Sequence, residues 1–256
     1  MCWDAIHAMI TIDTEHIMVP TRRALLGLSF ALPATAQGLT EVQRAEVLAL
    51  LRRALAEDPS ILRDALAAMD SADQAAAAET QRRAIRAQAD ALLRDAADPV
   101  RGNAGGAITV VEFFDARCSF CRAMQPTLEQ MLRRNRDVRL VLKDMPILGP
   151  NSVLASRALL AAQRQGKYLP LHDALMRLRE EVNETVLRRE AERLGLEWPR
   201  LRREMDDPAI ARRIEANLGL ARALDIQGTP ALVIGDSIIP GAMDLAQLEA
   251  AIAAIR

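Results

Sequence analysis

The feature that most constrains this chain is a pair of cysteines that follows directly on an apolar, β-branched run. Residues 107–114 read Ala-Ile-Thr-Val-Val-Glu-Phe-Phe, a composition typical of a buried central strand. Cys118 and Cys121 come next, and the residues from there to about 134 have a helical pattern. A strand that leads through Cys-x-x-Cys into a helix predicts an α/β domain with the first sulfur at the helix N-terminus.

That position has a chemical consequence for the two cysteines. The free amide groups and the dipole at a helix N-terminus favour an anion, and the pKa of a cysteine there falls from about 8.5 towards roughly 3.5–7.5. We therefore expect Cys118 to be the thiolate nucleophile and Cys121, one turn deeper, to resolve the mixed disulfide. Ser119 and Phe120 lie between them and are expected to tune the redox potential. Apart from a redox-active Cys118–Cys121 disulfide, no cofactor is predicted.

Residues 1–36 have the pattern of an export signal. Arg22 and Arg23 are followed by an apolar run over residues 24–32 and by Ala-Thr-Ala at 34–36, which predicts cleavage near Ala36. The apolar run is too short to span a bilayer. Residues 21–26 also fit a twin-arginine signal, so both that route and ordinary secretion stay open. The signal predicts a periplasmic protein. The alternative is a buried helix of the mature domain.

Cleavage near Ala36 would leave few metal-ligating side chains. The residues lost would be Cys2, His7 and His16, and those kept would be Cys118, Cys121 and His172. Two cysteines three positions apart cannot tie distant parts of a fold together, and the set is too small for a structural zinc site. The formal net charge of −1 over 256 residues argues against a general nucleic-acid-binding protein.

The rest of the chain alternates helical and strand patterns. Residues 37–97 are predicted to be helical, with a division at Asp58-Pro59. The part from 72 to 97 has few large apolar side chains, which favours a stalk or an oligomer interface. A turn-rich linker over 98–106 precedes the first strand. The elements expected after the cysteine helix are a strand at 138–143, a helical block at about 151–224, a hairpin of 231–234 with 237–239, and a final helix at 244–255.

Gly228-Thr229-Pro230 stands just before the late strand. Proline at the start of a strand is tolerated only in special positions. A cis peptide bond before Pro230 would expose the backbone of Thr229, which could then pair with an extended substrate segment beside Cys118. The alternative is an ordinary trans-proline turn, because cis is found in only about 5–6% of X–Pro bonds.

These motifs together match a known family. Val-Glu-Phe-Phe-Asp-Ala-Arg-Cys-Ser-Phe-Cys at 111–121, with Gly-Thr-Pro-Ala at 228–231, resembles the DsbA family of thioredoxin-fold thiol–disulfide oxidoreductases. The resemblance covers residues 98–256. It implies that the block at 151–224 is the family's helical insertion, that Pro126 is the helix-kinking proline, and that Pro230 is cis. It also implies that Cys118, Cys121, Thr229 and Pro230 form the catalytic site.

A closer likeness is to the ScsC (suppressor of copper sensitivity) branch. It is carried by the N-terminal helices, by Asp-Pro-Val-Arg-Gly-Asn at 98–103 and by the run at 143–150. It implies a disulfide isomerase or shuffling enzyme that acts on cysteine-containing secreted proteins. Residues 37–97 would then assemble a homo-oligomer, a trimer ahead of a dimer. A membrane reductase of the DsbD/ScsB type, rather than a quinone-linked oxidase, would be the redox partner.

Two charged residues near the cysteines are supporting candidates. Glu112 is six residues before Cys118, and strand alternation puts it on the side of Phe114, under the cysteine helix. This matches the buried acid of thioredoxin folds, which would relay a proton to or from Cys121. Lys143, at the end of the neighbouring strand, is expected to pair with Glu112. The alternative is a purely structural buried pair. His172 is expected to be a packing or capping residue.

Two other functions stay open. One is a monomeric, DsbA-like dithiol oxidase. The other belongs to a different class, a copper-binding or copper-tolerance protein that uses the two thiolates as soft ligands, with Met124 close by. The sequence leaves open the substrates and the direction of electron flow.

Overall fold

The computed structural model describes residues 38–256, so the predicted export signal over 1–36 lies outside the described residues. The chain divides into two compact units, one ending at Ser60 and the other running from Ile61 to Arg256. The boundary expected between residues 97 and 98 therefore falls inside the second unit. The two units are described separately below.

The first unit contains helix α1, Glu41–Glu57. Thr40 caps it: the Thr40 hydroxyl accepts a hydrogen bond from the amide of Gln43, and the Gln43 side chain accepts one from the amide of Thr40. None of the helix residues is buried. The large apolar residues left exposed in this unit are Leu39, Val42, Val47, Leu48, Leu50, Leu51 and Leu55. A helix with this much exposed apolar surface is typical of an interaction surface.

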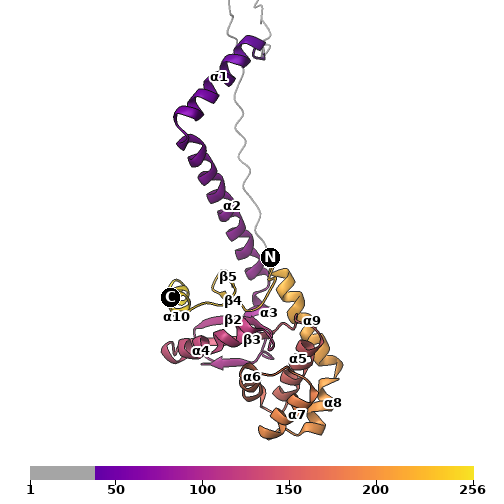
Figure 1. Cartoon of the computed structure of the whole chain (residues 1–256). Helices are drawn as coiled ribbons and strands as arrows, with labels where there is room; N and C mark the ends of the chain where they lie inside the picture. The colour runs from indigo at the N-terminus through magenta and orange to yellow at the C-terminus, as the bar shows by residue number, and fades with distance from the viewer. Residues whose placement is uncertain (1–37) are drawn as a thin grey trace, which may run out of the picture. The chain divides into compact units, whose positions relative to one another are not determined.

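The second unit is built on a five-stranded mixed sheet in the order β1-β3-β2-β4-β5 (Figure 1). The strands are β1 Val100–Gly102, β2 Ile108–Phe114, β3 Val138–Asp144, β4 Ala231–Ile234 and β5 Ser237–Pro240. The central pair β2 and β3 is parallel, while β1 pairs with β3, β4 with β2 and β5 with β4 in antiparallel fashion. This confirms the α/β fold class expected from the sequence.

Both faces of the central strands are buried, which explains why β2 is apolar along its length. Val110 and Phe114 belong to the larger core cluster, together with residues of the helix that carries the cysteines. Val111 and Phe113, which alternate with them, belong to a second cluster on the other face. The two faces of the sheet therefore pack against different core clusters. Side-chain alternation along a strand determines which cluster each of its residues contacts.

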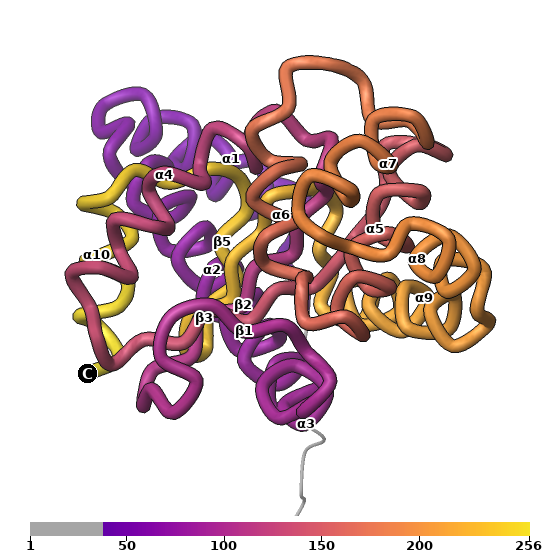
Figure 2. Tube along the Cα trace, turned by 90° about the horizontal axis from the view of Figure 1, so that it is seen from below, coloured from indigo at the N-terminus to yellow at the C-terminus, as the bar shows by residue number. Residues whose placement is uncertain are grey.

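The helices that follow the strands form two groups, which Figure 2 shows apart from one another. One consists of α4, Ser119–Arg134, and the C-terminal helix α10, Leu245–Ala253, which contact each other. The other is the predicted helical insertion. Its helices are α5 Pro150–Gln163, α6 Tyr168–Met176, α7 Glu184–Arg193, α8 Trp198–Met205 and α9 Pro208–Ala223.

The second core cluster includes part of the N-terminal helices. Helix α2 spans Ser60–Ala87 and α3 spans Ala89–Leu93. Ile85 and Leu92 are buried in the same cluster as Leu220 and Leu224, from α9 and its C-terminal end. The C-terminal end of α2 and the Leu92 side chain of α3 are thus part of the folded core.

The late hairpin matches its prediction. Gly235 and Asp236 connect β4 to β5, and Gly235 has a φ of 56°, which glycine adopts without strain. On the outer side of β5, the amide of Ile238 donates a hydrogen bond of 3.0 Å to Gln81 Oε1 on α2. The short strand β1 was expected to be linker, and it pairs Arg101 with Leu140 of β3.

Candidate active site

Cys118 is the N-cap residue of α4, as the sequence predicts. Its amide donates a hydrogen bond of 2.9 Å to the Asp115 carbonyl oxygen, which closes the turn between β2 and α4. Its side chain is buried, although Ser119 and Phe120 beside it are exposed, Phe120 to 64%. Cys118 is therefore held in a hydrogen-bonded turn, next to a large apolar side chain that is open to solvent.

Thr229 lies directly against this sulfur. Cys118 Sγ donates to the Thr229 carbonyl oxygen over 3.2 Å, a contact between residues 111 positions apart. The peptide bond between Thr229 and Pro230 is cis, as the family resemblance implies. The structure thus brings together Cys118, Thr229 and Pro230, which are far apart in the sequence.

Cys121 is the more deeply placed of the two cysteines and is fully buried. Both are free thiols in this structure. Burial raises the pKa of Cys121 well above its ordinary value, and the negative charges of Glu112 and Cys118 raise it further. Cys121 is therefore protonated at neutral pH.

Glu112 is fully buried on the face of β2 that it shares with Val110 and Phe114, as predicted. Neither of its carboxylate oxygens has a hydrogen-bond partner among the described residues. Burial raises the pKa of Glu112 to about 8, and the positive charge of Arg101 acts in the opposite direction. A carboxyl group with this pKa exchanges its proton in the range where thiol chemistry operates.

Arg101 was not singled out by the sequence analysis. Pairing of β1 with β3, and of β3 with β2, puts it on the same face of the sheet as Glu112. Its guanidinium group forms an ion pair with Asp173 on α6 and lies 3.4 Å from His172 Nδ1. His172 is buried and packs edge-on against Phe114, with ring centroids 4.8 Å apart. The expected packing role of His172 agrees with this position.

Lys143 does not pair with Glu112, and that prediction is wrong. In the parallel register Glu112 stands opposite Leu142, while Lys143 stands opposite Phe113 and points to the other face. Its Nζ lies 2.5 Å from Asp98 Oδ2 and 2.6 Å from the carbonyl oxygen of Ala91. Within each strand, alternation predicts which residues share a face of the sheet. The register between β2 and β3, which decides whether Glu112 and Lys143 share one, could not be predicted from the sequence.

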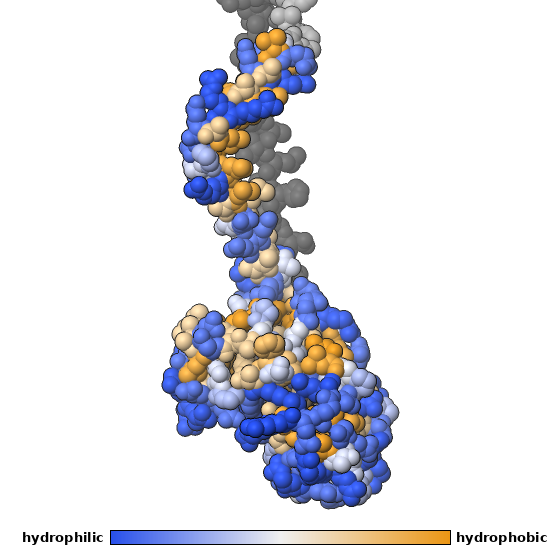
Figure 3. Space-filling model, in the orientation of Figure 1, coloured by the Kyte–Doolittle hydropathy of each residue, from blue (hydrophilic) through white to orange (hydrophobic). Residues whose placement is uncertain are grey.

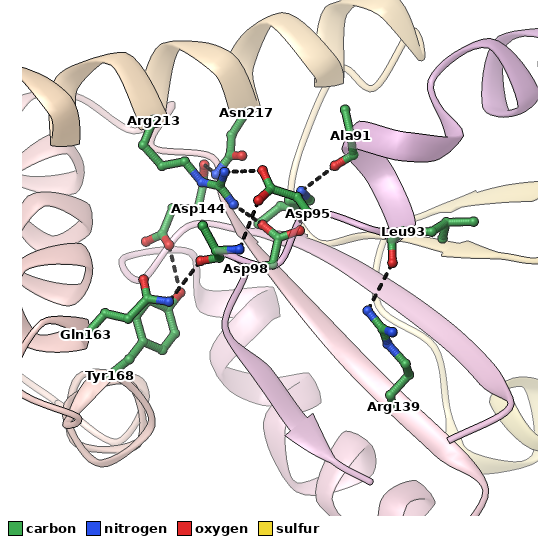
Figure 4. A network of polar contacts seen from close by, with 12 residues as sticks. Ala91, Leu93, Asp95, Asp98, Arg139, Asp144, Gln163, Tyr168, Arg213 and Asn217 are labelled. Carbon is green, nitrogen blue, oxygen red and sulfur yellow. Dashed lines mark hydrogen bonds and ion pairs between the residues drawn. The ribbon is translucent and has the colours of Figure 1, made fainter. Parts of the chain in front are cut away.

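The carboxyl group of Asp98 is part of a network that Figure 4 shows. Arg213 of α9 forms ion pairs with Asp95 and Asp98. The side-chain amide of Gln163 on α5 donates a hydrogen bond of 2.8 Å to the Ala97 carbonyl oxygen. This network fastens the segment between α3 and β1 to the sheet and the helical insertion. Lys143 is thus a structural residue.

Asp115 is a second residue that the sequence analysis missed. It is buried, and Oδ1 accepts a hydrogen bond of 2.8 Å from the Arg117 amide. Oδ2 accepts from the amides of Ile147 and Leu148, at 2.9 and 3.0 Å. One carboxylate therefore holds both the turn before Cys118 and the loop after β3. An aspartate directly after a strand and before a helix is a turn signal that could have drawn attention to it.

Two arginines join the cysteine turn to the helical insertion. Arg122 donates to the carbonyl oxygens of Ala116 and Leu178, at 2.9 and 3.1 Å. Arg117 forms an ion pair with Glu181 and a hydrogen bond to the Leu148 carbonyl oxygen. These contacts attach the turn before α4 to the segment that follows α6 in the helical insertion.

A second buried carboxyl group lies at the end of β3. Asp144 Oδ2 accepts a hydrogen bond of 2.7 Å from the Tyr168 hydroxyl, and Asp144 Oδ1 has no partner among the described residues. Burial raises the pKa of Asp144 to about 7. Asp144 and Glu112 are on the same face of neighbouring strands, so the core beneath the site contains two carboxyl groups that titrate near neutral pH.

Within residues 38–256, no three His, Cys, Asp or Glu side chains are grouped so as to hold a metal ion. Over the same residues no helix has both the length and the apolar character needed to cross a bilayer.

A central sheet with a Cys-x-x-Cys turn at a helix N-terminus, facing a cis-proline loop, defines a thioredoxin-like α/β fold. The chain belongs to the family of DSBA-like thioredoxin domains, whose family model matches residues 109–253.

Solved structures support this assignment. A thioredoxin-like oxidoreductase from Silicibacter pomeroyi is 40% identical, covers 65% of this chain and 96% of its own, and has a TM-score of 0.64. A linker-deletion mutant of ScsC from Proteus mirabilis is 31% identical, covers 86% of this chain and 98% of its own, and has a TM-score of 0.63. A periplasmic thioredoxin-like protein from Salmonella enterica serovar Typhimurium is 33% identical, covers 64% of this chain and 93% of its own, and has a TM-score of 0.58.

Among curated proteins, the chain is similar to the Na(+)/H(+) antiporter NhaA 3 of Salinispora tropica, with 31% identity over 157 residues. The match covers 60% of this chain and 24% of that protein. The chain thus spans about a quarter of the length of the curated relatives it matches.

Proposed function

We propose that this chain is a periplasmic thiol–disulfide oxidoreductase that works as a disulfide isomerase or shuffling enzyme on secreted proteins. The observation that carries the proposal is the position of Cys118, which is at the N-cap of α4 and 3.2 Å from the Thr229 carbonyl oxygen. The family and the similarity to ScsC support the activity. The similarity to a periplasmic protein and the export pattern near residues 22–36 support the location.

The chemistry begins with the Cys118 thiolate. It attacks one sulfur of a substrate disulfide, the substrate S–S bond breaks, and the other substrate sulfur leaves as a thiolate. Shuffling follows when another substrate thiolate attacks the substrate sulfur of the mixed disulfide. A new substrate disulfide then forms and Cys118 leaves as a thiolate, without net oxidation or reduction.

Cys121 provides the escape from a stalled mixed disulfide. Once deprotonated, it attacks the Cys118 sulfur, which releases the reduced substrate and leaves a Cys118–Cys121 disulfide. We assign the proton of Cys121 to Glu112, the buried carboxyl group whose charge acts on that thiol. The enzyme disulfide then requires two electrons, which we expect from a membrane reductase of the DsbD/ScsB type.

An isomerase of this kind works better when several active sites belong to one assembly. The N-terminal helices are suited to hold several copies of the chain together. Beyond the apolar side chains of α1, those of Ile61, Leu62, Leu66 and Met69 on α2 are exposed. Figure 3 shows apolar side chains along these helices. Covering them between copies would remove a large apolar area from water. We propose a homo-oligomer, a trimer ahead of a dimer.

The trapping experiment tests the chemistry. With Cys121→Ser, a mixed disulfide between Cys118 and a substrate protein should accumulate and be visible on a non-reducing gel. With Cys118→Ser no such adduct should form. Adduct formation through Cys121 in the Cys118→Ser protein would contradict the assigned roles.

The assembly is tested by placing charges on α1. The double variant Leu48→Glu, Leu51→Glu should have a smaller mass in solution and lose activity on a scrambled substrate, while its reaction with glutathione disulfide is unchanged. Arg52→Glu, which replaces a positive by a negative charge on the same helix without removing an apolar side chain, is the control. Full isomerase activity in a monomeric double variant would contradict the role of the helices. A strongly oxidising monomer without isomerase activity would support a dithiol oxidase instead.

A further inference from the structure

Arg122 lies one helical turn beyond Cys118, and its amide donates a hydrogen bond of 3.1 Å to the Cys118 carbonyl oxygen. Side chains on a helix lean towards its N-terminus, so that of Arg122 is directed back to the turn that holds Cys118. There Nε of Arg122 donates a hydrogen bond of 2.9 Å to the carbonyl oxygen of Ala116. The guanidinium group is therefore attached to the backbone just before the reactive cysteine.

The helical insertion holds the other side of this guanidinium group. Nη1 of Arg122 donates a hydrogen bond of 3.1 Å to the carbonyl oxygen of Leu178, which follows the end of α6. Both acceptors are neutral, and over residues 38–256 Arg122 forms no ion pair with a carboxylate. Burial lowers the pKa of Arg122, and the charge of Arg117 acts in the same direction. Arginine nevertheless stays protonated in proteins, so Arg122 is a half-buried positive charge.

The other charges around the cysteine turn are matched or negative. Arg117 forms an ion pair with Glu181, which offsets its charge. Asp115 accepts hydrogen bonds from three backbone amides, and its negative charge disfavours a second anion in the same turn. The negative charge of Cys118 raises the pKa of Arg122, which means that the two charges stabilise each other. Arg122 is thus placed to offset the repulsion between Asp115 and a Cys118 thiolate.

We propose that Arg122 sets the redox potential of the Cys118–Cys121 pair by stabilising the Cys118 thiolate, with Leu178 of the helical insertion holding the guanidinium group in place. The inference rests on the proposed function and deepens it, since it concerns the same two sulfurs. Only the reduced form has an anion at Cys118, because both sulfurs are neutral in the disulfide. A positive charge beside Cys118 therefore favours the reduced form and makes the disulfide a stronger oxidant.

The equilibrium with glutathione tests this inference. The whole chain is incubated at pH 7 with reduced and oxidised glutathione in varied proportion, and the fraction with the Cys118–Cys121 disulfide is measured. Arg122→Gln should raise the equilibrium constant for forming that disulfide about fivefold, because the reduced form loses its stabilising charge. Arg122→Glu should raise it further. Arg122→Lys keeps the charge and should leave the constant close to that of the unaltered protein.

The matched control is Arg133→Gln, which removes the same charge from the last turn of α4, far from the cysteines. It should not change the equilibrium constant. A second readout is the ultraviolet absorbance of the thiolate, which a merely structural role would not move. Because Cys121 is protonated at neutral pH, this absorbance reports Cys118 in the reduced protein. The midpoint of its pH titration should rise in Arg122→Gln and stay unchanged in Arg122→Lys.

Equal equilibrium constants in Arg122→Gln and Arg133→Gln would overturn the inference. So would the same change in Arg122→Lys as in Arg122→Gln, because the effect would then come from the lost hydrogen bonds and not from the charge. An unaltered chain that forms no Cys118–Cys121 disulfide in any glutathione mixture would instead refute the proposed function, and this inference with it.

Discussion

Lys143 Nζ lies 2.5 Å from Asp98 Oδ2, on the opposite face of the sheet from Glu112. Both side chains of the pair are buried, and Arg213 approaches the same carboxylate from α9. The buried lysine next to the active-site strand is therefore used to attach the segment before β1. It is not available to the buried acid beneath the cysteines.

Replacing this lysine should change stability and leave the chemistry intact. Lys143→Met removes one partner of a buried ion pair, and we expect the free energy of unfolding to fall by roughly 3 kcal/mol. The rate with glutathione disulfide should stay the same. Urea unfolding and stopped-flow kinetics measure the two quantities. The double variant Lys143→Met, Asp98→Asn should lose less free energy of unfolding than the two single variants lose together. A changed rate with glutathione disulfide in Lys143→Met would show that Lys143 does act on the site.

Stability should decline as the pH rises towards 8. Burial raises the pKa of Glu112 to about 8 from 4.5 and that of Asp144 to about 7 from 3.8. Between about pH 4 and 8 the folded chain therefore holds protons that the unfolded chain has released, so the free energy of unfolding falls with rising pH. Glu112→Gln should remove much of this dependence and stabilise the protein at pH 8 by on the order of 3 kcal/mol.

Urea titrations at pH 4, 6 and 8 measure this effect. The two proteins should be equally stable at pH 4, where Glu112 is protonated in both the folded and much of the unfolded population. If Glu112→Gln changed the free energy of unfolding by the same amount at every pH, the pKa of Glu112 would have to be the same in the folded and the unfolded chain, which would contradict the raised pKa.

Substitutions at Arg101 and Asp173 should shift the titration of Glu112 in opposite directions. The positive charge of Arg101 lowers the pKa of Glu112, and Asp173 is its ion-pair partner. Arg101→Gln removes that charge and should raise the Glu112 pKa. Asp173→Asn leaves the arginine charge uncompensated and should lower it. Carbon-13 NMR of labelled glutamate measures the pKa of Glu112 in both variants. In the control Arg101→Lys, which keeps the positive charge, this pKa should stay near that of the unaltered protein. Shifts of the same sign would contradict this electrostatic account.

Asp115 should matter for both folding and rate. Asp115→Ala leaves the amides of Arg117, Ile147 and Leu148 without their acceptor. Because unsatisfied buried amides are costly, we expect a loss of about 2–3 kcal/mol in unfolding free energy. The turn that positions Cys118 should loosen, which slows the reaction with a peptide disulfide. Asp236→Ala, in the exposed hairpin turn, is the control. Unchanged stability would mean that the loop after β3 is held by other contacts.

Local sequence signals predicted the parts of the fold that depend on local structure. The run at 107–114, the helix after Cys118 and the hairpin around Gly235 were all expected and were found. Strand β1 was not expected, because it has only three residues and ends in glycine. Its pairing with β3, about 40 positions away, is what makes it a strand.

The candidate site was predictable only where residue type alone implies chemistry. Cys118 and Cys121 were found from their spacing, and Thr229 and Pro230 from a family resemblance. The partners of Glu112 and Lys143 depend on the register between β2 and β3, which neither strand contains by itself. Arg101 gave no signal, since it is one arginine among many until two strand pairings bring it to the face of Glu112.

The contact between Gln81 and Ile238 has a further consequence for assembly. With that amide occupied and Pro240 lacking one, the outer strand offers no template for adding a strand from a neighbouring molecule. At the far edge, β1 is too short to serve as one. In the oligomer that we propose, the sheets of neighbouring copies are therefore not expected to pair edge to edge, although the N-terminal helices would hold the copies close together.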